Sequence, residues 1–127
     1  MAQKTYNETV LGIEWKIVID TNWYHIPFIL AAATTYGKTT LFEVGLVPNA
    51  VALAHEYHHV LTTSWLRYVI SYTIGKLWGS TYWKDEEISA NAYGLANAGN
   101  PVFQAISDKI KADFPSYPVV NINHPVS

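Results

Sequence analysis

The chain contains no cysteine, which excludes a disulfide framework and any thiolate metal site. A bound metal would therefore need histidine and carboxylate ligands. Charged residues are also scarce, at 14% of the 127 residues against the usual quarter or so. Lysine and arginine are scattered singly and the formal net charge is −2, so the basic stripe typical of nucleic-acid binding is missing. We expect no nucleic-acid partner.

Long apolar runs are missing as well. No stretch approaches the roughly 18 apolar residues of a membrane-spanning helix, because the nearest, 60–79, is interrupted by Arg67, Lys76 and several hydroxyls. Residues 1–10 lack the pattern of a signal peptide. We predict a cytoplasmic protein, with virion association as the alternative. A membrane-surface module built on the aromatic residues of 60–79 is the weakest hypothesis, because one arginine and one lysine attract anionic lipid poorly.

The residues that are abundant favour one folded domain spanning 1–127. Half of the 127 residues are hydrophobic, including nine tyrosines and five tryptophans, which is enough to form a core at this length. Alternation over 13–20 predicts a strand with Ile13, Trp15, Ile17 and Ile19 on one face. A second strand is predicted over 38–46. The stretch 23–37 is ambiguous, and within it 28–33 is compatible with a short helix or a buried strand.

Helical patterns fill the second half of the chain. Asn49 is a plausible N-cap for the first helix, and Asn100-Pro101 has the cap-then-proline order of a helix start. The tail 114–127 contains three prolines and is predicted to be irregular. Strands followed by helices indicate an α+β fold. The predicted helices cover 48–63, about 65–78, about 85–97, and the residues from 101 onward.

One short motif carries the chemistry. His55-Glu56-Tyr57-His58-His59 satisfies H-E-x-x-H, a pattern that shuffling this composition would produce in roughly one chain per hundred. Four residues advance a helix by about 400°, so His55 and His59 share a face and can bind one zinc at about 2.0–2.1 Å. Glu56 is rotated by about 100° from His55 and can instead take a proton from a metal-bound water.

A catalytic zinc site needs a third protein ligand and one open position. His25 and His124 are candidates without a supporting context. Asp85, Glu86 and Glu87 at the head of a predicted helix are better candidates. We favour Glu87, and interpret the other two acidic residues as charges that stabilise the helix N-terminus.

The residues that follow support that choice. Asn91 lies one turn after Glu87 and could hydrogen-bond a ligand's second atom, while Ala90 is small enough for two helices to approach closely. His58 is one residue out of phase with His55, so we expect it to pack or to face water rather than to bind metal.

H-E-x-x-H followed by this E-x-x-A-N helix resembles the gluzincin metallopeptidases. The likeness covers about 34–97 and is greatest to the small single-domain members, the minigluzincins and related peptidase-like proteins of bacteria and phages. It implies a zincin-like domain in which a short antiparallel or mixed sheet, with an edge strand in 34–45, precedes an active-site helix and packed C-terminal helices. It also implies Zn²⁺ bound by His55, His59 and Glu87, with Glu56 as general base and Asn91 in support.

The resemblance leaves the oxyanion-stabilising residue open, with Tyr93 and Tyr57 as candidates, and the substrate-binding modules of larger relatives are missing. The first functional hypothesis is a zinc peptidase whose peptide or protein substrate pairs with a strand near 38–44. The alternative is a non-catalytic structural or interaction protein, such as a phage virion component with an assembly partner, that keeps the metal site. A further hypothesis makes the tail an autoinhibitory segment, on the basis of Tyr117 and His124.

Overall fold

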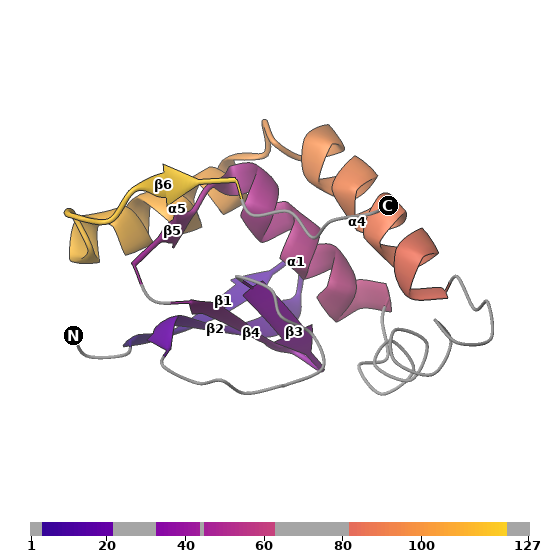
Figure 1. Cartoon of the computed structure of the whole chain (residues 1–127), viewed down its shortest axis with the longest axis horizontal. Coiled ribbons are helices and arrows are strands. Elements are labelled where there is room, and N and C mark those ends of the chain that lie inside the picture. The colour runs from indigo at the N-terminus through magenta and orange to yellow at the C-terminus, as the bar shows by residue number, and fades with distance from the viewer. Residues whose placement is uncertain (1–3, 22–32, 44, 63–81, 122–127) are drawn as a thin grey trace.

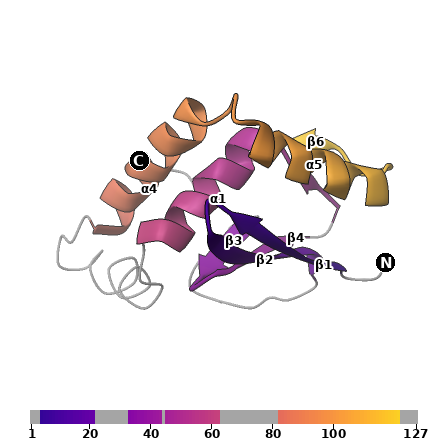
Figure 2. The same cartoon turned by 180° about the vertical axis from the view of Figure 1, so that it is seen from behind.

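The computed structural model describes residues 4–21, 33–43, 45–62 and 82–121. The fold is mixed α+β, as the order of sequence patterns predicts. A sheet forms one layer, helix α1 crosses one of its faces, and helices α4 and α5 pack against α1 (Figures 1 and 2). The predicted helix near 65–78, His25 and His124 all lie outside the described residues.

The sheet has the strand order β1-β2-β4-β3. β1 and β2 form an antiparallel hairpin, β2 and β4 are parallel, and β3 and β4 are antiparallel, so the sheet is mixed. The hairpin turns at Leu11 and Gly12, whose φ angles of 50° and 81° match the type I′ turn that joins twisted strands. β1 was not predicted from the sequence. The strands span Lys4–Val10 (β1), Ile13–Thr21 (β2), Ala33–Tyr36 (β3) and Thr39–Glu43 (β4).

Two strand predictions need correction. The strand expected over 38–46 ends at Glu43, and Val47–Pro48 forms a separate short strand, β5. This β4 is also interior, because it pairs with β2 on one side and β3 on the other, so the predicted peptide-binding edge at 38–44 is wrong. Among the described residues, β3 is the edge strand next to α1.

The helix predictions are confirmed where the structure describes them. α1 spans Ala50–Thr62, and the side chain of Asn49 accepts a hydrogen bond of 2.8 Å from the backbone N–H of Ala52. α4 spans Tyr82–Ala96, and α5 spans Pro101–Asp113 with Asn100 as its N-cap. No helix in the described ranges combines the length and apolar character needed to cross a bilayer.

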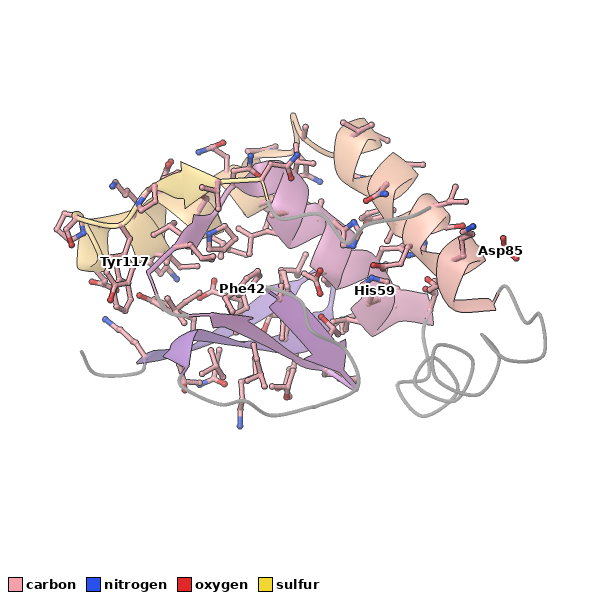
Figure 3. The ribbon with its side chains drawn as sticks, viewed as in Figure 1. Phe42, His59, Asp85 and Tyr117 are labelled. Carbon is pink, nitrogen blue, oxygen red and sulfur yellow. The ribbon has the colours of Figure 1, made fainter. Side chains whose placement is uncertain are left out.

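Helix α1 is the centre of the core because it is covered on several sides. Tyr57, fully buried, packs against Trp15 of the sheet at 5.3 Å and against Phe103 of α5 at 5.6 Å between ring centroids. From the sheet, Phe42 points toward this helix (Figure 3). Eight of the thirteen residues of α1 are buried, and the polar residues His55, Glu56 and His59 are among them.

The C-terminal segment is not wholly irregular, which corrects the prediction for 114–127. Val119–Val120 forms β6, parallel to β5, and the carbonyl of Val120 accepts a hydrogen bond of 2.9 Å from the N–H of Asn49. Tyr117 stacks on Phe114, and Figure 3 shows it well away from His59. The autoinhibition hypothesis stays a prediction, because His124, the other residue on which it rests, lies outside the described residues.

Candidate metal centre

Helices α1 and α4 bring the predicted ligands together. Nε2 of His55, Nε2 of His59 and a carboxylate oxygen of Glu87 converge, and their donor atoms all lie within 4.8 Å of one another. The three side chains are buried, with exposed fractions of 0%, 4% and 0% respectively. His59 lies between the two helices, while Asp85 projects outward at the start of α4 (Figure 3).

The distances between donor atoms suit a small tetrahedral metal ion. Ligands about 2.0–2.1 Å from zinc stand about 3.3–3.4 Å apart when the geometry is tetrahedral. The two Nε2 atoms are 3.3 Å apart, and Nε2 of His55 is 3.4 Å from Oε1 of Glu87. The third edge, from Nε2 of His59 to Oε1 of Glu87, is 2.5 Å and would have to lengthen. Two of three edges therefore already have the length that zinc requires.

The charge of the cluster also fits a divalent cation. Glu56 and Glu87 are both fully buried within 4 Å of a histidine nitrogen. Burying an ionised carboxylate costs several kcal/mol unless it is compensated, and a divalent cation held by the same carboxylates is one way to compensate it. Imidazole nitrogens and a carboxylate oxygen are also the ligands that zinc takes where no cysteine is present, so the residues fit the metal in donor type and spacing.

Small residues on α4 set its distance from α1. Ala90 is fully buried, and a Cβ built on Gly94 would lie only 2.9 Å from the backbone oxygen of Val51. The two helix backbones therefore nearly touch one turn from His55. Ala90 and Gly94 follow Glu87 at helical spacings of three and seven residues, so the same face of α4 carries the carboxylate and the close contact. Ala90 was expected in this role, whereas Gly94 was missed.

Glu56 lies beside the three ligands and is held by the sheet. Its Oε1 accepts a hydrogen bond of 2.8 Å from the hydroxyl of Thr35 on β3. Its Oε2 is 3.6 Å from Nε2 of His55, so this oxygen faces the cluster. The carboxylate is thus outside the group of three ligands but close to it, which is the arrangement expected of a general base.

His58 and Glu86 form a neighbouring pair rather than part of this site. Nδ1 of His58 is 3.0 Å from Oε1 of Glu86, and the hydroxyl of Thr62 donates to the same oxygen at 2.6 Å. Glu86 also lies 4.0 Å from Nδ1 of His59, so His58, His59 and Glu86 form a second, half-buried group of potential ligands. The pair joins α1 to α4, a contact that the expectation of a packed or water-facing His58 did not include.

Asn91 lies on α4 one turn after Glu87. Its buried Oδ1 has no hydrogen-bond partner within the described part of the chain. The predicted role of Asn91 as a support for a ligand stays a prediction.

The two tyrosines proposed to stabilise an oxyanion have different environments. The hydroxyl of Tyr57 donates a hydrogen bond of 2.6 Å to the carbonyl of Val10, so its single proton is engaged in the core. Tyr93 is half-buried, and its ring lies 5.3 Å from that of His58. Burial raises the pKa of both phenols, so both stay protonated at neutral pH. Tyr93 is the better of the two candidates.

A surface hollow lies elsewhere, on β1, β2 and the turn before β4. It is lined by Asn7, Glu8, Thr9, Glu14, Trp15, Lys16, Lys38 and Thr39, and by none of the clustered histidines and glutamates. Its charged lining residues are two lysines and two glutamates. It offers no set of metal ligands.

Comparisons of the chain with protein-family models, with curated proteins and with solved structures find no match. The functional argument therefore rests on the residues of the site.

Proposed function

We propose that the protein is a zinc-dependent peptidase. The observation that carries the proposal is the convergence of His55, His59 and Glu87, with Glu56 beside them but outside the ligand group. A structural zinc site usually has four protein ligands, whereas three ligands with a neighbouring carboxylate are typical of hydrolytic sites. The choice of Glu87 over Glu86 is supported by its contacts with both histidines.

In this proposal His55, His59 and Glu87 hold the metal. Zinc, when bound, supplies Lewis acidity that lowers the pKa of a coordinated water to about 7 and polarises a carbonyl group. Glu56 takes a proton from the attacking water as the water oxygen bonds to the scissile carbonyl carbon. Glu56 then gives that proton to the amine as the carbon–nitrogen bond breaks, so that atoms and charge balance.

The edge strand offers a place for the substrate backbone. β3 pairs with β4 on one side, and its other side has no strand partner among the described residues. An extended peptide could pair there through main-chain hydrogen bonds, which would place it beside α1. Thr35 of this strand contacts Glu56, so a peptide on β3 would lie close to the proposed base.

One observation favours a second candidate, a non-catalytic protein that keeps the metal as a structural clip. All four clustered side chains are almost completely buried, whereas a catalytic site must open to its substrate. Ile88 and Leu95, seven residues apart on α4, are 53% and 71% exposed and could serve an assembly partner.

Metal analysis and a peptide-cleavage assay distinguish these candidates. The peptidase should bind about one zinc per chain and hydrolyse members of a broad peptide library. Glu56→Gln should keep the zinc and lose hydrolysis. Zinc binding without hydrolysis would move the assignment to the structural candidate, and wild-type protein that binds no zinc would refute both.

Matched variants show whether the ligands are the predicted ones. Glu87→Gln should lose the zinc, whereas Glu86→Gln, one residue earlier on the same helix, should retain it. His55→Ala should likewise lose it, and His58→Ala should not. Equal zinc loss in all four variants would indicate general unfolding or a different ligand set.

A further inference from the structure

A chain of hydrogen bonds connects the interior of the sheet to Glu56. The indole Nε1–H of Trp15 on β2 donates to the hydroxyl of Thr40 on β4 at 2.9 Å. The hydroxyls of Thr40 and Thr35 are 2.7 Å apart, and the hydroxyl of Thr35 donates to Oε1 of Glu56 at 2.8 Å. The chain thus crosses three strands and reaches helix α1.

The strand register explains why these groups meet. Thr35 and Thr40 are directly opposed across β3 and β4, and side chains of opposed residues lie on the same face of a sheet. That face is the one covered by α1, since Thr40 and Phe42 are both fully buried. Trp15 is 1% exposed, so the chain of hydrogen bonds starts in the core, where it is shielded from water.

The two ends of the chain fix the direction of every hydrogen bond. An indole N–H can only donate, and an ionised carboxylate can only accept. Thr35 therefore gives its proton to Glu56 and accepts from Thr40, and Thr40 gives its proton to Thr35 and accepts from Trp15. Hydrogen bonds aligned in one direction polarise one another, and each hydroxyl is left with one orientation.

We propose that Trp15, Thr40 and Thr35 are positioning residues that hold the Glu56 carboxylate in its working orientation. The chain fixes Oε1, and this leaves Oε2 directed toward the cluster, 3.6 Å from Nε2 of His55. The inference rests on the proposed peptidase function, in which Glu56 is the base. It adds that the sheet, and not the helix alone, orients that base.

Thr35 has a second consequence because it lies on the edge strand. Its backbone belongs to the strand proposed to pair with substrate, and its side chain touches the base. A substrate seated on β3 would therefore hold the same residue that orients Glu56. Thr35 would therefore couple the pairing of substrate with β3 to the position of the Glu56 carboxylate, although Thr35 itself does not bind the metal.

The test uses the zinc-loaded, full-length protein with substitutions that change one hydroxyl. Thr35→Val removes the hydroxyl while keeping the shape of the side chain, and Thr35→Ser restores a hydroxyl. Thr39→Val is the matched control, because Thr39 lies on the neighbouring strand β4 but takes no part in the chain of hydrogen bonds. Thr35→Val should lower kcat by roughly 10- to 100-fold, the usual range for partners of site residues, with KM and zinc content unchanged. Thr35→Ser should recover most of kcat, and Thr39→Val should match wild type.

A second measurement does not need activity. The indole N–H signal of Trp15 in a two-dimensional ¹⁵N–¹H NMR spectrum, assigned by its loss in Trp15→Phe, reports on the hydrogen bond to Thr40. Thr35→Val should shift this signal because Thr40 loses its acceptor, whereas Thr39→Val should leave it in place. An unshifted signal together with unchanged kcat would overturn the inference.

The two measurements separate the inference from the function beneath it. If wild type and all variants lack hydrolysis but the Trp15 signal shifts, the peptidase proposal fails together with the catalytic role of the chain. If Glu56→Gln abolishes hydrolysis but Thr35→Val does not, the peptidase proposal stands and the positioning role is wrong. Loss of zinc in Thr35→Val would also contradict positioning, since the effect would then act through the metal.

Discussion

The close approach of α4 to α1 leads to a prediction about Gly94. A Cβ added at this position would lie 2.9 Å from the backbone oxygen of Val51 and 3.4 Å from Cβ of His55. The carbonyl of Val51 belongs to helix α1 and cannot rotate away without breaking the helix. Gly94→Ala should therefore push α4 away from α1.

The size of the effect follows from the distances. Ordinary contact begins at 3.4 Å, so the helices must separate locally by about 0.5 Å, the difference from 2.9 Å. Overpacking of this kind costs about 1–3 kcal/mol, while replacing a glycine within a helix gains about 1 kcal/mol. We expect the free energy of unfolding of the metal-free protein to fall by about 1 kcal/mol.

The proposed metal site should respond more strongly than the fold. Glu87 is on the same face of α4 as Gly94, and its carboxylate must meet two histidines of α1. Metal–ligand distances tolerate a deviation of about 0.2 Å, less than the expected displacement. Zinc affinity should fall by roughly tenfold, comparable to the loss of a group that orients a ligand.

The assay compares Gly94→Ala with Gly99→Ala. A Cβ at Gly99 would meet no atom within 4 Å, so this control adds the same methyl group without a clash. Urea unfolding in the presence of a chelator reports the stability of the fold, and competition with a zinc-binding dye reports affinity. If both variants bind zinc and unfold alike, the helix contact does not set the geometry of the site.

Three further predictions concern the metal, the core and pH. Chelation of zinc should lower the midpoint of thermal unfolding, because zinc at about 100 times its dissociation constant adds about 2.7 kcal/mol of stability; an unchanged midpoint would contradict binding to the folded state. Tyr57→Phe should lower the free energy of unfolding by about 1–3 kcal/mol, measured in urea, because the buried carbonyl of Val10 loses a donor; a neutral effect would mean that this bond adds nothing. Hydrogen bonds from Lys4 and Tyr6 lower the pKa of Asp113, so its contribution is present above the ordinary carboxyl pKa and is lost as pH falls through the lower, folded-state value. The stability difference between wild type and Asp113→Asn should therefore shrink on acidification to about pH 3, and a constant difference would refute this.

Much of the candidate site could be predicted from local sequence. Helix α1 follows from its cap at Asn49 and its run of helix-forming residues, and the four-residue spacing then puts His55 and His59 on one face. The choice of Glu87 came from a second short pattern on another helix. Such inferences succeed because helical geometry depends on neighbours in sequence.

The sheet was harder to predict because strand pairing depends on residues far apart. β1 went unrecognised, and β4 was taken for an edge although β2 and β3 flank it. Two residues in the tail form a strand only because β5 is there to pair with them. None of these facts is encoded in a single stretch of the chain.

The sequence by itself determined which side chains could bind a metal, since the absence of cysteine leaves histidine and carboxylate ligands and helical periodicity aligns two of the histidines. Only the tertiary structure brought Glu87, the carboxylate that the second motif favoured, to both histidines, because that contact requires α4 to pack against α1. It alone also joined Trp15, Thr40 and Thr35 to Glu56, through a strand register that brings distant hydroxyls within hydrogen-bonding distance. Local geometry depends on residues that are neighbours in sequence, whereas contact between elements depends on the packing of the whole chain.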